Sequence, residues 1–191
     1  MNRKWIPLIT VCLVGMIVMP VQVFPATVRP PQRGEVTLRV GERLPDVPLT
    51  ATTGETVTLA RLDGRVKLIS IVPQLNTPVC DEQTHHFSEQ NGGLDRQLEL
   101  ITVSTNTSED QVNFAKKARI SNIRFFSDAP DYAFGKKTGL LLPLYGVLHR
   151  AVMVADADNV IRYLQVVPMG ELPNFDAAYD AARHLVQAHE R

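Results

Sequence analysis

The chain has 191 residues, and its 20 Lys and Arg residues balance 20 Asp and Glu residues. A chain of this length is expected to form one domain with room for a hydrophobic core. The balanced charge argues against nucleic-acid binding and against an acidic partner surface, both of which call for an excess of basic residues.

The N-terminal part of the chain has the composition of a targeting segment. A basic start at residues 2–4 is followed by the apolar stretch Trp5–Ala26. Its short Pro-free centre is typical of a signal peptide, while the whole stretch is also long enough for an uncleaved membrane anchor. We therefore expect an exported, extracytoplasmic protein, either periplasmic or anchored and facing outside. Residues 27–34 then form an extended linker and residues 35–191 the folded domain.

The chain holds two cysteines, Cys12 and Cys80. Cys12 lies in the apolar N-terminal stretch, so the expected domain keeps a single thiol and forms no internal disulfide. In an exported protein a lone thiol indicates reactivity or pairing with another molecule. The alternative interpretation is a buried, inert cysteine, which is the commoner fate of free cysteines.

The domain is expected to alternate short apolar strands with helices. The predicted strands are Glu35–Val40, a hairpin over Leu49–Leu59 turning at Thr53-Gly54, Val66–Val72, Leu98–Ser104, Phe125–Phe126, Arg150–Ala155 and Val160–Val167. The predicted helices are Cys80–Gln90, Ser108–Arg119 with a capping box at Ser108–Gln111, Tyr132–Thr138 and Phe175–Ala188, and Leu140–Leu148 is predicted to be an apolar loop. Crossover helices mixed with hairpins predict an α/β protein of thioredoxin-like fold, with a mixed central sheet flanked by helices and an N-terminal β-hairpin.

The stretch around Cys80 has the pattern of a strand followed by a helix. Val66–Val72 is apolar and rich in β-branched residues, as a buried strand should be. Pro78 stands where a helix start tolerates proline, and the residues from Cys80 to Gln90 contain no further Pro or Gly. Cys80 therefore falls in the first helical turn, where unpaired N–H groups and the positive end of the helix dipole favour a thiolate.

The same stretch carries a family resemblance. Pro73, Thr77 and Cys80 form the string P-x-x-x-T-x-x-C, and the longer run VPQLNTPVCDEQTHHF is most similar to the thiol peroxidase branch of the peroxiredoxin superfamily. Further similar stretches are FGKKTG, LHRAVMVAD and the late VVP and PNFDAA runs, so the resemblance extends from about Thr37 to Ala188. It implies a thiol-dependent peroxidase that needs no cofactor and forms a homodimer.

The resemblance also implies roles for individual residues. Cys80 is the peroxidatic nucleophile, Thr77 orients the peroxide, and Arg150 holds the thiolate and stabilises charge as the O–O bond breaks. The substrate pocket is expected around Pro73, Val79 and His149. Structural alternatives stay open for three of these residues: Thr77 as an ordinary helix N-cap, Arg150 as a solvated strand end and Pro73 as a strand terminus.

One departure from the resembled branch affects how the enzyme is recycled. Relatives carry a second, resolving cysteine in an F-A-x-x-x-x-C helix, and here the matching run Phe114–Ile120 ends in Ile120. The oxidised Cys80, a sulfenic acid, is therefore expected to be reduced by an external thiol, either a small thiol or a thioredoxin-like protein. The substrate is expected to be hydrogen peroxide or an organic hydroperoxide. The alternative is a redox sensor that passes oxidation to a partner without turnover.

A metal site is not expected. His85 and His86 are adjacent on the predicted helix, so they do not share a helix face, and no ligand pair with metal spacing accompanies them.

Overall fold

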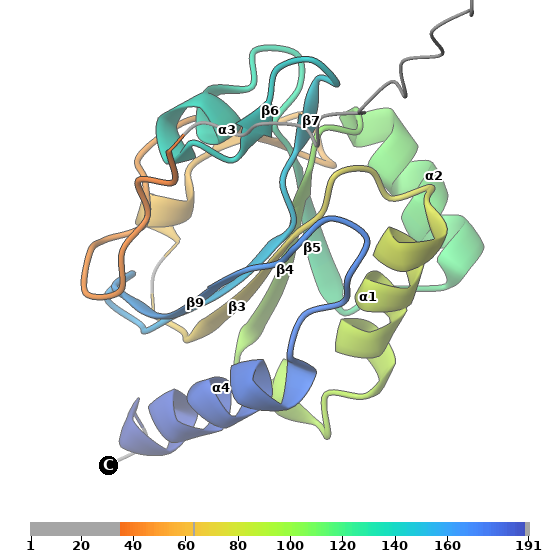
Figure 1. The fold of residues 1–191 in the computed structure, drawn as a ribbon. Helices are drawn as coiled ribbons and strands as arrows, with labels where there is room; N and C mark the ends of the chain where they lie inside the picture. The colour runs from red at the N-terminus through yellow and green to blue at the C-terminus, as the bar shows by residue number, and fades with distance from the viewer. Residues whose placement is uncertain (1–34, 63, 190–191) are drawn as a thin grey trace, which may run out of the picture. The chain divides into compact units, whose positions relative to one another are not determined.

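The structure, a computed structural model, describes residues 35–62 and 64–189 (Figure 1). Its strands are β1 (Leu49–Ala51), β2 (Thr56–Val57), β3 (Lys67–Ile71), β4 (Glu99–Ser104), β5 (Ile123–Ser127), β6 (Leu141–Leu142), β7 (Val147–Leu148), β8 (Ala151–Ala155) and β9 (Ile161–Val166). Its α-helices are α1 (Pro78–Glu89), α2 (Ser108–Ala118), α3 (Ala133–Thr138) and α4 (Phe175–His189), and short 3-10 turns span Leu59–Arg61 and Leu94–Arg96.

A seven-stranded mixed sheet forms the centre, in the order β2-β1-β5-β4-β3-β8-β9. Strands β3, β4 and β5 are parallel, and the outer pairs are antiparallel. Parallel neighbouring strands need crossover connections. Here α1 lies in the connection from β3 to β4, and α2 lies in the connection from β4 to β5. The predicted α/β, thioredoxin-like architecture and the hairpin of β1 and β2 are confirmed.

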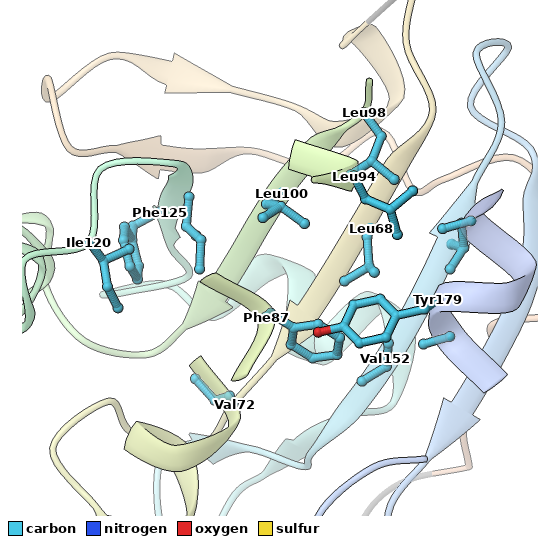
Figure 2. Packing of buried hydrophobic residues seen from close by; sticks show 14 of the residues in the cluster. Leu68, Val72, Phe87, Leu94, Leu98, Leu100, Ile120, Phe125, Val152 and Tyr179 are labelled. Carbon is cyan, nitrogen blue, oxygen red and sulfur yellow. The ribbon is translucent and has the colours of Figure 1, made fainter. Parts of the chain in front are cut away.

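Two hydrophobic cores fill the two faces of this sheet, because side chains alternate along each strand. One face packs against α1, α2 and α4, where Leu68, Leu100 and Val152 of the sheet meet Phe87 and Tyr179 of the helices (Figure 2). The opposite face packs Ile69, Ile101 and Met153 against the 35–62 region and α3. Burial on both sides explains why β3 is buried along its whole length.

The sheet register determines where the active residues meet. In β3 and β8, which are antiparallel, Ile71 pairs with Ala151, so the residue before β8 lies beyond the C-terminal end of β3. That residue is Arg150. The chain leaving β3 enters α1 at the same edge, with Thr77 at the N-cap and Pro78 as the first helical residue. Strand order therefore brings the start of α1 and the start of β8 together, although they are distant in sequence.

Three local predictions were wrong. Glu35–Val40 forms no strand. The Thr37 N–H donates to the Thr138 carbonyl (3.1 Å), the Arg39 carbonyl accepts from the Glu42 N–H in a local turn (3.3 Å), and the segment crosses Gly139 closely enough to exclude any side chain there. The predicted loop 140–148 contains the paired strands β6 and β7. The cap of α2 is Thr107, one residue before the predicted box.

The predicted signal peptide or anchor at residues 1–26 and the linker at 27–34 lie outside the described residues. Among residues 35–62 and 64–189, no helix has both the length and the apolar character needed to cross a bilayer.

Candidate active site

Cys80 is the third residue of α1 and is almost fully buried, with 1% of its surface exposed. Its Sγ accepts a hydrogen bond from Nη2 of Arg150 at 3.2 Å. The sulfur is therefore buried beside a cation, in a site that excludes water. Such a contact stabilises a thiolate more strongly than it stabilises a neutral thiol. The structure brings together the predicted nucleophile and the predicted cation. Arg150 is only 4% exposed, so the alternative that it is a solvated strand end is wrong.

A second buried residue holds the guanidinium in place. Nη1 of Arg150 donates to Oε1 of Gln83, and Nε2 of Gln83 donates to Oγ of Ser70 in β3 at 2.7 Å. Gln83 lies one turn after Cys80 on α1, so both ends of the guanidinium are bound by the same helix. This arrangement fixes the plane of the guanidinium while leaving its charge next to the sulfur.

Sequence reasoning missed Gln83. The sequence does hold one indication of its role. Gln83 is an amide on the buried face of α1, where the other buried residues are small or apolar, namely Cys80, Thr84 and Phe87. A buried amide on such a face needs a polar partner, and here that partner is Arg150, just before β8 and 67 residues away.

Thr77 occupies the N-cap position of α1, but its side chain does not cap the helix. The hydroxyl donates to the carbonyl of Gln74 at 3.1 Å, while the backbone carbonyl of Thr77 accepts from the N–H groups of Cys80 (3.0 Å) and Asp81 (2.9 Å). Because its proton is used by Gln74, the hydroxyl oxygen keeps its lone pairs for an incoming donor. A hydroperoxide O–H is such a donor.

Two of the three predicted pocket residues, Val79 and His149, are chain neighbours of Cys80 and Arg150. Pro73 is half-buried, and its carbonyl accepts from the Thr105 hydroxyl at 3.1 Å. Val79 is half-buried in the first turn of α1. His149 is buried beside Arg150, with Nδ1 3.2 Å from the Arg150 carbonyl oxygen. Their roles toward a substrate remain predictions.

The far end of α1 is fixed against α4 by aromatic contacts. The ring of His86 stacks on Phe175 at 3.6 Å, and its Nδ1 lies 3.0 Å from the hydroxyl of Tyr179. Burial lowers the pKa of His86, despite the opposing effect of nearby carboxylates. The neutral imidazole is therefore favoured, and these contacts anchor the C-terminal half of α1 to α4.

No second cysteine approaches Cys80 within the described residues, where Cys80 is a free thiol. Ile120, at the position of the relatives' resolving cysteine, is buried in the core shared by α1 and α2. Its side chain contributes packing to this core.

Known proteins resemble this chain over most of its length. The sequence model of the Redoxin family matches residues 39–179. A thiol peroxidase of Streptococcus pneumoniae (strain R6) is 38% identical over 149 residues, which cover 78% of this chain and 91% of that protein. A thiol peroxidase of Listeria innocua is 35% identical over 146 residues, which cover 76% and 88%.

Solved structures share the fold. A peroxiredoxin-like protein from Aquifex aeolicus superposes with a TM-score of 0.70 and 30% identity, over 78% of this chain and 88% of that one. A thiol peroxidase from Chromobacterium violaceum superposes with a TM-score of 0.66 and 24% identity, over 83% and 90%. The Redoxin match covers the segment that holds Thr77, Cys80 and Arg150. The chain belongs to the redoxin family and, within it, to the thiol peroxidase type of peroxiredoxin.

Proposed function

We propose that this thiol-dependent peroxidase reduces hydrogen peroxide or an organic hydroperoxide with Cys80 as the nucleophile. The observation that carries the proposal is the 3.2 Å contact between Sγ of Cys80 and Nη2 of Arg150 inside a buried site. A fixed guanidinium beside a sulfur at a helix start favours the thiolate, which is the reactive form.

The chemical step follows from this geometry. The thiolate attacks the terminal peroxide oxygen, so that an S–O bond forms while the O–O bond breaks. Sulfur is oxidised by two electrons to the sulfenic acid, and the departing oxygen takes a proton and leaves as an alcohol or water. Charge moves from the sulfur to the departing oxygen during this step. Arg150, held by Gln83, can follow that charge because its guanidinium carries several donors in one plane.

Thr77 has the geometry to orient the peroxide. Its hydroxyl oxygen is an acceptor near the start of α1, so it can bind the peroxide O–H and direct the O–O bond toward the sulfur. Both Thr77 and Arg150 would then touch the substrate, whereas Gln83 acts on it only through Arg150.

The oxidised enzyme is reduced by an external thiol, because the described domain has no second cysteine. We also propose that the N-terminal segment exports the protein, since residues 2–26 have the pattern of a signal peptide or an anchor. A homodimer is proposed by analogy with the thiol peroxidase family alone.

A peroxide-consumption assay with dithiothreitol as the electron donor tests the function. We expect catalytic turnover by the protein and none by Cys80→Ser, a substitution close in size that removes the nucleophile. Circular dichroism of the variant checks that the fold is intact. Equal peroxide consumption by the two proteins would contradict the proposal.

A second candidate is a redox sensor, because Cys80 is the only cysteine within residues 35–62 and 64–189. A sensor would form one equivalent of sulfenic acid at Cys80 and then stop, even with excess dithiol. The same assay, followed over many equivalents of peroxide, separates these two functions.

A further inference from the structure

A pocket of about 570 Å³ lies between the first turns of α1 and the second half of α2. Its apolar lining includes Leu75, Phe114 and Ala118, and its polar lining comes from both helices. Small-molecule sites usually span roughly 300–1,000 Å³ and combine apolar walls with a few polar groups. This pocket therefore suits a molecule of about tripeptide size.

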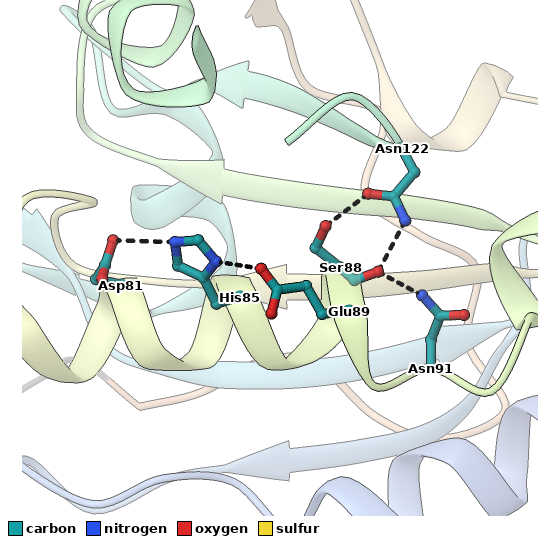
Figure 3. A network of polar contacts seen from close by, with 6 residues as sticks. All are labelled: Asp81, His85, Ser88, Glu89, Asn91 and Asn122. Atoms are coloured by element: carbon teal, nitrogen blue, oxygen red, sulfur yellow. Dashed lines mark hydrogen bonds and ion pairs between the residues drawn. The ribbon is translucent and has the colours of Figure 1, made fainter. Parts of the chain in front are cut away.

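Charged groups of both signs line the pocket. Lys117 contributes an ammonium that has no hydrogen-bond or ion-pair partner within residues 35–62 and 64–189. Asp81 contributes a carboxylate 3.7 Å from the ring of His85, which Glu89 also contacts at 2.8 Å (Figure 3). The pocket thus offers a cation for a ligand carboxylate and a carboxylate within reach of a ligand ammonium.

The pocket adjoins the turn that carries the nucleophile. Thr77, Pro78 and Asp81 line it, and Cys80 lies between the last two of these residues in the chain. The sulfur itself is 1% exposed and bound to Arg150, so it is not part of the lining. The first turn of α1 has no side-chain cap, so it is less costly to open locally than a capped turn.

We infer that this pocket binds the reducing co-substrate, a low-molecular-weight thiol that carries a carboxylate, with Lys117 as its anion contact. The inference rests on the proposed peroxidase function, because it concerns the step that restores Cys80. A small thiol is favoured over a protein thiol, because the sulfur is buried and the adjoining space has the size of a small ligand.

Reduction of the Cys80 sulfenic acid to the thiol consumes two molecules of the external thiol. The first thiol attacks the sulfenic sulfur, so that an S–S bond forms, the S–O bond breaks and the oxygen leaves as water. The second thiol attacks the mixed disulfide, releases the Cys80 thiol and leaves as the external disulfide. Two electrons pass from the two thiols to Cys80.

The test uses full-length protein oxidised by one equivalent of hydrogen peroxide, with the sulfenic acid verified by intact mass. It is then mixed with reduced glutathione, a tripeptide thiol with two carboxylates, and mixed-disulfide formation is followed by quenched-flow mass spectrometry. The variant is Lys117→Glu. Its matched control is Lys116→Glu, which has the same charge change in the same last turn of α2 but does not line this pocket.

We expect a rate that saturates with glutathione concentration and falls about tenfold in Lys117→Glu but not in Lys116→Glu. With cysteamine, a thiol without a carboxylate, the two variants should react alike. Equal rates for the two variants with glutathione, or reduction by a thioredoxin-like protein alone, would overturn the inference while leaving the peroxidase intact. If peroxide forms no sulfenic acid, the proposed function fails at the first step and the thiol site fails with it.

Discussion

The helix that carries Cys80 begins differently from the other three α-helices of the described domain. The Thr107 hydroxyl caps α2 by accepting from the Asp110 N–H at 3.1 Å. The N-cap residue of α3, Tyr132, makes no side-chain bond, but the Asp128 carboxylate accepts from the first-turn N–H groups of Phe134 and Gly135, both at 2.8 Å. The Asn174 side chain caps α4 by accepting from the Ala177 N–H at 3.0 Å. In α1, Thr77 stands at the same position as Thr107, yet its side chain makes no such bond.

The difference shows how one residue type can serve structure in one place and chemistry in another. In α1 the N–H that a capping side chain would bind is that of Cys80 itself, three residues after Thr77. A cap there would direct the Thr77 oxygen to the backbone and away from a substrate. We infer that α1 gives up about 1 kcal/mol of capping energy to keep this hydroxyl available for the peroxide.

Of the substitutions considered, Arg150→Met should have the largest effect on the oxidation of Cys80. The substitution removes the charge beside the sulfur but keeps an unbranched side chain, so the second-order rate constant for Cys80 oxidation should fall by about a thousandfold. Stopped-flow or quenched-flow kinetics with hydrogen peroxide measures it. Arg150→Lys keeps the charge without the planar donors, so its rate constant should lie between those of the parent protein and Arg150→Met. A rate within a few-fold of the parent protein in Arg150→Met would break the account.

Thr77→Val should have the next largest effect, on rate alone. Loss of the hydroxyl removes the proposed peroxide contact, so we expect the oxidation rate constant to fall by about a hundredfold. Because the side chain makes no cap and its bond to the Gln74 carbonyl is solvent-exposed, the free energy of unfolding measured in urea should change little. Thr77→Ser, which restores a hydroxyl, should recover most of the rate.

Thr107→Val is the matched substitution at the N-cap of α2. In contrast to Thr77→Val, it should lower stability and leave the oxidation rate unchanged. Loss of the bond to the Asp110 N–H should lower the free energy of unfolding by about 1 kcal/mol. The oxidation rate constant should match that of the parent protein, because α2 supplies no group to the sulfur. If both threonine variants lose stability and keep their rates, the two helix starts are equivalent and the contrast disappears.

Asp128 should give the smallest effect, a pH dependence of stability. Burial raises the pKa of this carboxyl to about 6 from its ordinary 3.8, although the N–H groups of Gly135 and Phe134 oppose the shift. The folded state therefore holds this proton more tightly than the unfolded state. Its contribution is complete below about pH 4 and is lost as the pH rises through about 6.

Asp128→Asn removes this titration. Urea unfolding at several pH values between about 4 and 7 should show that the parent protein loses stability relative to the variant as the pH rises. At every pH, the variant is expected to have a lower free energy of unfolding than the parent protein, since an amide cannot accept from both N–H groups of α3. A pH-independent difference between the two proteins would show that Asp128 does not titrate in this range.

The sequence was sufficient to predict the strand and helix around Cys80, because apolar runs, Pro78 and the later glycines are local signals. It also predicted the pairing of Cys80 with Arg150, through the family resemblance. It could not predict Gln83 as a positioning residue, because its role depends on Arg150, which is 67 residues away in the sequence. The failure at residues 35–40 has the same cause, since that segment contacts Gly139 instead of a strand partner.

The most direct test of the central claim is the rate constant for oxidation of Cys80 by hydrogen peroxide, measured beside free cysteine at the same pH. The account predicts a value above about 10⁴ M⁻¹s⁻¹, in the range of efficient enzymes and far above that of free cysteine. Reaction at the speed of free cysteine would mean that Arg150 and the start of α1 do not activate the sulfur, and it would contradict the account.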